Sequence, residues 1–131
     1  MNWNGSITVI SPQDDGQTLH SVPLDEFLFF EVEQRQIWGH TAYGVYRLPW
    51  NSLKVLHNLV QASAEGFEKA DKACVVNVRK IKRLDPELGV AHFAGCDGRD
   101  KTCFVAECHI KRLQALLDKL HRNRHPDALQ N

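Results

Sequence analysis

The chain has 131 residues, of which 43% are hydrophobic and 24% are charged, and its Lys and Arg balance its Asp and Glu to a formal net charge of zero. These values are typical of one globular domain, and no apolar run approaches the roughly 20 residues that a membrane-spanning helix needs. The first residues lack the basic start and apolar core of a signal peptide, so we expect a cytoplasmic protein without a membrane partner.

The first third of the chain alternates short apolar runs with clusters of turn residues. This pattern predicts strands at 7–10, 18–22, 27–32, 37–42 and 45–48, with a one-turn connector at 23–26. The run at 27–32 is the most apolar, and we expect it to be a central strand. The polar residues 33–36 separate it from the next strand.

A helix is predicted at 51–63. Pro49, Asn51 and Ser52 mark its start, and Gly66 follows its end. Its apolar positions recur at the i, i+3, i+4 spacing of an amphipathic helix: Leu53, Val55, Leu56, Leu59 and Val60.

Beyond Gly66, a turn containing Phe67, Lys69 and Lys72 precedes the short apolar strand at 74–78. Two more strands, at 90–94 and 101–106, flank the polar hairpin tip at 95–100. A second helix is predicted at 109–121, with one apolar face: Ile110, Leu113, Leu116, Leu117 and Leu120.

These elements predict a mainly β fold, with antiparallel sheets and hairpins of short strands, one central helix and one C-terminal helix. No βαβ alternation is present, which disfavours an open parallel sheet. We expect a single domain over residues 1–121 and a flexible tail over 122–131, where Pro126 interrupts the helical pattern.

Charge is divided unevenly between the two halves of the chain. Residues 1–65 hold three basic residues against seven acids, and residues 66–131 hold thirteen against nine, so the halves carry −4 and +4. Such a division is a weak indication of contact with nucleic acid, because basic residues often only form a solvated face.

The sequence contains no enzyme signature: it has no phosphate-binding glycine loop, nucleophile elbow or zinc-protease motif. The four cysteines form no CxxC pair, which makes a structural zinc improbable, although Cys96, Cys103, Cys108 and His109 could be imagined as a ligand set. We therefore expect no catalytic residue, no cofactor and no metal, with Cys74 as a small buried residue of its strand.

Residues 66–113 resemble the LytTR DNA-binding domain of bacterial transcriptional regulators, whose central signature is approximately Gly-Phe-Phe-Arg-x-His-Arg-Ser-Tyr-Ile-Val-Asn. Gly66-Phe67 and Val75-Val76-Asn77 match it closely, and 104–106 fall on the family's Pro-Val-Ser. Asn51-Ser52-Leu53 also matches the start of the family's helix, so the likeness extends over roughly residues 6–118.

The resemblance implies a mainly β fold whose loops enter successive DNA major grooves. It implies a transcription regulator that binds short direct repeats of double-stranded DNA, usually as a pair of domains. We expect this regulator to lack a receiver domain and to bind as a homodimer or as paired domains. The residues expected to contact DNA lie in the loop after residue 32, around the signature and at the start of the last helix: Gln34, Arg35, Gln36, Lys69, Lys72, Glu107, His109 and Lys111.

Each position also has a structural interpretation: a solvated hairpin tip for 33–36, core packing for Val75 and Val76, and a turn fixed by the side chain of Asn77. The chain departs from the family at Asp71-Lys72, where His-Arg is usual, and at Glu107, where Arg is usual. These acids leave open an alternative function, a LytTR-fold module that binds or antagonises a regulatory protein. In either case, Cys103 and Cys108 could form a thiol-based redox sensor.

Overall fold

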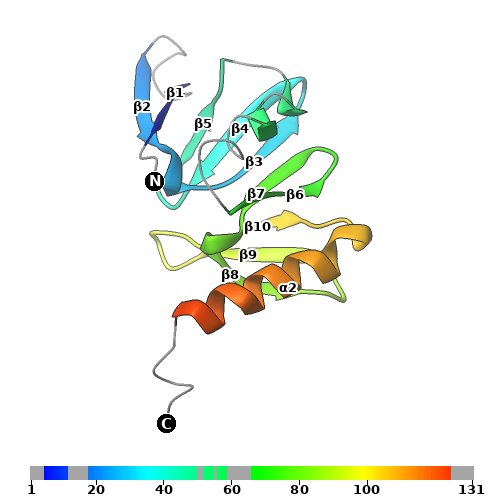
Figure 1. The fold of residues 1–131 in the computed structure, drawn as a ribbon. Helices are drawn as coiled ribbons and strands as arrows, with labels where there is room; N and C mark the ends of the chain where they lie inside the picture. Colours follow the sequence, from blue (N-terminus) through cyan, green and yellow to red (C-terminus); the bar gives the residue numbers. More distant parts are fainter. Residues whose placement is uncertain (1–4, 12–17, 50–51, 55, 59–65, 125–131) are drawn as a thin grey trace.

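The computed structural model describes residues 5–11, 18–49, 52–54, 56–58 and 66–124. Among these residues, ten strands form two antiparallel sheets that lie one beyond the other, and a long C-terminal helix crosses the smaller sheet (Figure 1). The seven-stranded sheet has the order β2-β1-β5-β4-β3-β7-β6, and the three-stranded sheet has the order β10-β9-β8.

The strands of the large sheet are β1 Ser6–Ile10, β2 Leu19–Pro23, β3 Phe27–Glu33, β4 Gln36–Thr41, β5 Val45–Arg47, β6 Phe67–Asp71 and β7 Cys74–Asn77. The small sheet holds β8 Ile81–Asp85, β9 Val90–Ala94 and β10 Asp100–Phe104. Two 3-10 turns, η2 Leu24–Glu26 and η3 Val78–Lys80, connect strands, and helix α2 covers Glu107–Arg124.

The strongly apolar strand β3 is central because both of its faces are covered. Phe27 and Phe30 belong to a core cluster with β1, β4 and the described part of the first helix. Leu28 and Phe29 belong to a second cluster, which the large sheet shares with the small sheet and α2. A strand that is buried on both faces has no polar alternation, and this explains the unbroken run of four buried residues.

Helix α2 packs its apolar face against the small sheet. Leu113 and Leu117 are buried in the same cluster as Ala91 and Phe93 of β9. In Figure 1 the helix runs diagonally across β8, β9 and β10, with its N-terminal end close to the turn between β6 and β7. The position of this end of α2 is therefore set by the sheet beneath it.

Asn77 fixes the connection between the two sheets. Its side-chain amide donates a 3.0 Å hydrogen bond to the carbonyl of Phe27, and its Oδ1 accepts a 3.2 Å bond from the backbone N–H of Arg79. The residue is buried, at 3% exposure. The structural interpretation of Asn77, a residue that fixes a turn, is confirmed.

The predicted mainly β, antiparallel fold with a central and a C-terminal helix is confirmed, as is the core position of Val75 and Val76. Of the first helix, predicted at 51–63, the described residues 53, 54 and 56–58 are helical and the remainder lies outside the described residues. The second helix begins two residues earlier and ends three residues later than predicted.

Two strands were not predicted. Phe67–Asp71 was taken as a turn, but it forms the edge strand β6, and 81–85 was given no element, but it forms β8. In both strands a β-bulge shifts the register, between Lys69 and Asp71 and between Ile81 and Arg83. A bulge inserts an extra residue, so the alternation of apolar and polar residues by which a strand is recognised is lost.

Candidate nucleic-acid interface

Three segments that are far apart in the sequence meet along one edge of the molecule, which we call the turn edge. It consists of the β3–β4 turn (residues 33–36), the β6–β7 turn (71–73) and the start of α2 (106–111), and all three lie on the right-hand side of Figure 1. Backbone hydrogen bonds at and next to these segments connect them: Val32, which precedes the first turn, donates to Ala73 O at 2.9 Å, and Ala106 donates to Ala70 O, just before the second turn, at 2.8 Å. The three segments therefore have fixed relative positions.

The β3–β4 turn presents two polar side chains at its tip. Gln34 and Arg35 are exposed and have positive φ, 52° and 65°. Glu33 and Gln36 close the hairpin as a register pair, and Gln36 is half-buried. Positive φ at both central residues is the requirement of a tight two-residue hairpin turn of the I′ type, which normally contains Asn-Gly. This tip therefore holds two long polar side chains in a conformation that favours other residues.

The β6–β7 turn carries Lys72, which is exposed, beside the half-buried Asp71. Lys69 is also exposed but lies within β6, before the bulge. The bulge moves the strand out of register immediately before the turn, which changes the direction of the residues that follow it. Lys72 thus occupies the tip, and Lys69 lies behind it on the strand.

The start of α2 is the third segment. Glu107 and Lys111 are exposed, and His109 is half-buried. Glu107 is the first residue of the helix, where a carboxylate stabilises the positive end of the helix dipole by about 0.3–1 kcal/mol. The acid that departs from the family pattern therefore has a structural role at the helix end.

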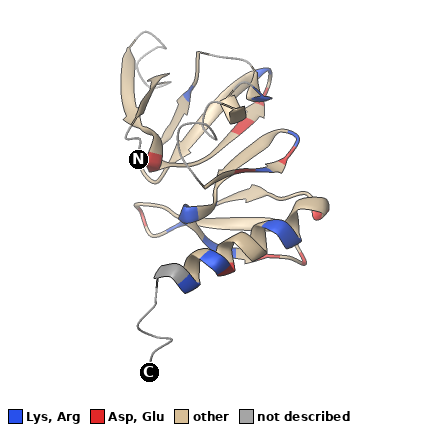
Figure 2. Cartoon of the chain, in the orientation of Figure 1, with Lys and Arg blue, Asp and Glu red and all other residues tan. Residues whose placement is uncertain are grey.

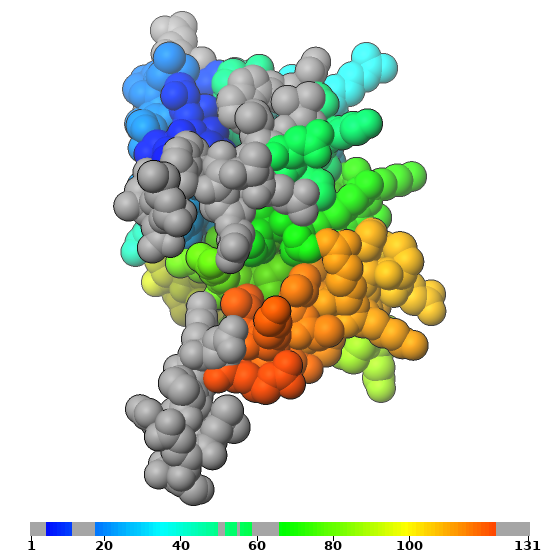
Figure 3. Space-filling model, viewed as in Figure 1, coloured from blue at the N-terminus to red at the C-terminus, as the bar shows by residue number. Residues whose placement is uncertain are grey.

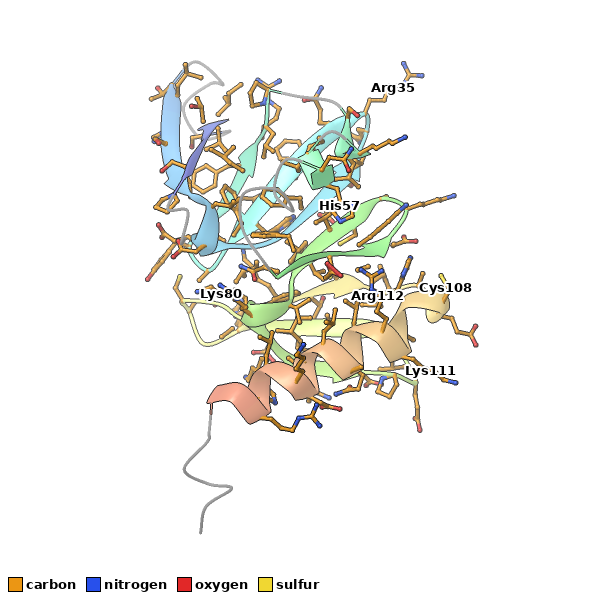
Figure 4. All side chains as sticks on the ribbon, viewed as in Figure 1. Arg35, His57, Lys80, Cys108, Lys111 and Arg112 are labelled. Atoms are coloured by element: carbon orange, nitrogen blue, oxygen red, sulfur yellow. The ribbon has the colours of Figure 1, made fainter. Side chains whose placement is uncertain are left out.

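Charges of both signs lie along the turn edge. Arg35, Lys69, Lys72 and Lys111 are exposed cations, and Glu33, Asp71 and Glu107 are the acids between them. Figure 2 shows blue and red positions side by side on the turns and along α2, and in Figure 3 the side chains of the two hairpin turns project from the right-hand edge. In Figure 4, Arg35, Cys108 and Lys111 lie on this side, whereas Lys80 lies on the opposite side.

An ion pair joins α2 to β6 directly behind the turn edge. Arg112, on α2, is half-exposed and its guanidinium pairs with the carboxylate of Glu68. Arg112 was not among the predicted site residues. It follows Lys111 within the predicted helix 109–121, but no pattern in the sequence pairs it with Glu68 of β6.

His57 lies near this ion pair, on the first helix. Burial lowers the pKa of its imidazole, and the nearby carboxylate of Glu68 opposes that effect. Among the side chains that the structure describes, its Nε2 is the buried nitrogen without a hydrogen-bond partner. A proton added to this imidazole would therefore be poorly solvated.

The cysteines lie in different surroundings. Cys74 and Cys103 are buried in the core shared by the two sheets, whereas Cys96 and Cys108 are exposed. A hydrogen bond to the thiol of Cys103, together with burial, raises the pKa of Cys74. Cys103 and Cys108, considered together above as a redox sensor, thus lie one in the core and one at the surface.

Within the described ranges, no group of three or more His, Cys, Asp or Glu side chains is placed to hold a metal ion. The imagined ligand set is divided, because Cys103 is buried while Cys96 and Cys108 are exposed. None of the described helices is long and apolar enough to cross a lipid bilayer.

Comparison with solved structures gives a match to the LytTr DNA-binding domain of a protein described as a methyl-accepting/DNA response regulator, from Bacillus cereus. The TM-score is 0.65, the identity is 16%, and the match covers 86% of this chain and 96% of the other. At this identity the likeness shows the fold. No curated protein matches the chain in sequence. The family model of the LytTr DNA-binding domain matches residues 17–118, most of the chain. The chain therefore belongs to the LytTR family of DNA-binding domains.

Proposed function

We propose that this domain binds DNA in a sequence-specific manner and regulates transcription, and that the turn edge is its DNA-contacting surface. The observation that carries the proposal is the convergence of two hairpin turns and one helix start on a single edge, linked through the backbone. Polar side chains of the right chemistry for base edges project from each segment.

The proposed contacts follow from the chemistry of the side chains. Arg35 can donate two hydrogen bonds to guanine O6 and N7, and Gln34 can pair with adenine N6 and N7. Lys69, Lys72 and Lys111 are suited to phosphate oxygens or to guanine. Gln36 and His109 are half-buried, so we assign them supporting roles at the base of their segments.

The acidic residues favour particular bases over others. Asp71 and Glu107 repel phosphates, but a carboxylate can accept a hydrogen bond from the N4 amino group of cytosine. We propose that Glu107 selects for cytosine, or against the other bases, at one position. Because acids lie among the cations of the turn edge, we expect non-specific DNA binding to be weak, since it depends on contacts between cations and phosphates.

We further propose that two copies bind short direct repeats in the bacterial cytoplasm, as a homodimer or as paired domains on DNA, with activity set by abundance, dimerisation or a partner. A single domain presents three segments, a small surface, and pairing on DNA multiplies the affinity of the two domains through effective concentration.

A second candidate function is a protein-interaction module that pairs with a DNA-binding relative and antagonises it. The net charge of zero and the acids at positions 71 and 107 favour it. It uses the same turn edge but predicts a protein partner.

Selection of binding sites from randomised double-stranded DNA by the purified protein separates the two candidates. The proposed function predicts enrichment of a short motif that recurs in direct orientation. If repeated rounds enrich no motif at low salt, where phosphate contacts are strongest, the domain is not a sequence-specific DNA binder and the interaction module is favoured.

A further inference from the structure

The start of α2 is attached to strand β6 at a point that the bulge in this strand creates. The register between β6 and β7 shifts between Lys69 and Asp71, and Ala70 is the described residue of β6 that pairs with no residue of β7. The extra residue of a bulge is left outside the ladder, so its backbone groups can bond elsewhere. The carbonyl of Ala70 accepts the 2.8 Å hydrogen bond from the backbone N–H of Ala106, directly before α2. This bond is the first attachment of the helix to β6.

A second attachment lies further along both elements. The guanidinium of Arg112 pairs with the carboxylate of Glu68, and in Figure 4 Arg112 lies on the side of α2 that faces β6. The side chain of Glu68 is 18% exposed, against 51% for Arg112, so the carboxylate is the more sheltered partner. Its charge also acts on the imidazole of His57, on the first helix. Glu68 therefore lies where the first helix, β6 and α2 meet.

The two attachments enclose the part of α2 that belongs to the turn edge. Residues 107–111 lie between Ala106 and Arg112, which would be about 9 Å apart along the axis of a regular helix. Glu68 and Ala70 are roughly 7 Å apart along their strand. One attachment would leave the helix start able to pivot, whereas two attachments at this spacing also fix its direction.

Apolar packing alone does not define this direction. Ile110 and Leu113 hold α2 against the core shared by the two sheets. Hydrophobic contact is not directional, whereas the ion pair and the backbone bond each join particular atoms. Contacts with bases depend on direction, because a hydrogen bond weakens steeply when its donor and acceptor are misaligned.

We propose that Glu68 and Arg112 are positioning residues for DNA recognition, whose ion pair sets the direction in which residues 107–111 are presented relative to Lys72 at the β6–β7 turn. This role requires no contact between the pair and a base. Exposed ion pairs contribute little to stability, so the pair acts on sequence preference more than on folding. The consequence for DNA rests on the proposed function, and the attachment itself is measured without DNA.

Equilibrium binding to the best selected site and to a scrambled duplex tests the effect on DNA. Glu68→Gln and Arg112→Gln should each lower the preference for the selected site severalfold. The double variant should lower it no further than the larger single effect, because the two residues act through one another. Arg112→Lys should keep most of the preference, since an ammonium group also pairs with a carboxylate. Additive losses in the double variant would overturn the proposal.

A direct contact of Arg112 with the DNA backbone predicts a different pattern. Arg112→Gln would then weaken binding to both duplexes alike and lower the salt dependence by about one unit. Glu68→Gln would strengthen binding, because it releases the guanidinium. Effects of opposite sign in these two variants would therefore overturn the proposal.

Lys82→Gln is the matched control, because it removes another exposed cation from an ion pair. Lys82 pairs with Asp100 at 3.0 Å within the small sheet. Its replacement should leave the preference for the selected site unchanged. If Lys82→Gln lowers that preference as much as Arg112→Gln does, the effect is one of charge alone and the proposal fails.

Amide hydrogen exchange of the protein without DNA measures the attachment. We expect the Ala106 amide, whose bond to β6 is the first attachment, to exchange faster in Glu68→Gln and in Arg112→Gln, because local opening of the helix start becomes easier. The Val105 amide bonds to the carbonyl of Gly89 at 2.8 Å, beside the small sheet, and should exchange as in the parent. Unchanged exchange of Ala106, or equal acceleration of Val105, would overturn the proposal.

The two measurements separate this proposal from the proposed function. If no DNA motif is selected, the proposed function fails, and the exchange of Ala106 still decides whether the ion pair holds α2 on β6. If a motif is selected and both single variants keep the preference of the parent, the domain reads DNA without the ion pair and the positioning role fails. The dispersion of the amide resonances verifies that each variant is folded.

Discussion

Gln34 and Arg35 occupy the left-handed region of backbone conformation, with φ of 52° and 65°. A residue with a Cβ atom is disfavoured there by roughly 1–2 kcal/mol, and Asn and Gly are the residues that tolerate it best. Strain of this kind gathers at functional sites, where side-chain chemistry outweighs local stability. We interpret Gln34 and Arg35 as residues that are present for their side-chain chemistry, although their backbone conformation lowers the stability of the domain.

Replacing the pair by the residues that the turn prefers, Gln34→Asn with Arg35→Gly, should raise the free energy of unfolding by roughly 1–2 kcal/mol. Urea unfolding at constant pH measures it. Gln34→Ala is the matched control, since alanine retains the positive-φ penalty. A double variant no more stable than the parent would show that the turn is not strained.

Asn77 makes two hydrogen bonds through its side chain, a buried one to Phe27 and a partly buried one with Arg79. Asn77→Ala should destabilise the domain by about 1–3 kcal/mol, because the Phe27 carbonyl loses its donor in a buried position. Asn58→Ala, at an exposed helical position, should change stability little. Equal effects of the two substitutions in thermal unfolding would contradict this role of Asn77.

His40 and His57 have lowered pKa values, in both cases chiefly because of burial. At His40 the carboxylates of Glu31 and Glu33 oppose the shift and Lys101 adds to it, while the ring stacks on Phe29. The unfolded chain then binds protons more readily than the folded one, so stability is lost as pH falls below the ordinary value of 6.5.

Unfolding should therefore occur at lower urea concentration at about pH 5.5 than at about pH 7.5, and the difference should shrink in His40→Gln and His57→Gln. Glutamine keeps a hydrogen-bonding group but does not titrate. A pH dependence that is the same in the parent and in both variants would assign the effect to other groups.

At the scale of elements, the sequence predicted those strands whose side chains follow a simple pattern. The unbroken apolar run of β3 and the alternation of β9 were recognisable. β6 and β8 were not, because bulges place their buried residues, Phe67 with Ala70 and Ile81 with Leu84, three positions apart. That spacing is typical of a helix and is not a strand signal.

The sequence predicted which segments form the candidate site, but it did not predict how these segments are arranged in the fold. Lys72 and Arg35 were assigned to loop tips, where the structure has them. The backbone bonds from Val32 to Ala73 and from Ala106 to Ala70 join segments that are distant in the chain. The sequence does not reveal these hydrogen bonds, because every residue except proline has the same backbone N–H and C=O groups.

Lys72, at the tip of the β6–β7 element, should contribute to DNA binding. If it contacts a base edge, Lys72→Ala costs about 1–3 kcal/mol and relaxes specificity at one position. If it contacts a phosphate, all sequences are bound more weakly and the salt dependence falls by about one unit. Fluorescence anisotropy over a range of salt concentrations distinguishes the two.

Lys80→Ala is the matched control, because Lys80 is exposed on the side of the molecule opposite Arg35 and Cys108 (Figure 4). It should leave operator affinity close to that of the parent. If Lys72→Ala behaves as Lys80→Ala does, Lys72 lies outside the interface.

Two hydrophobic core clusters hold the whole domain together. One cluster is formed by the large sheet and the first helix, and the other lies between the large sheet, the small sheet and α2. The two hairpin turns belong to the large sheet on one side of this second cluster, and the start of α2 belongs to the other side. The net charge of zero means that affinity has to come from specific contacts more than from the overall field.

Equilibrium DNA binding tests whether the turn edge reads base sequence. The parent and the double variant Gln34→Ala with Arg35→Ala are compared on the best selected site and on a scrambled duplex. Both alanines retain the positive-φ penalty, so the melting temperature should stay the same while preference for the selected site falls roughly tenfold or more. A double variant that binds its best site as tightly and as selectively as the parent would contradict the claim, because the tip would then be only a solvated turn.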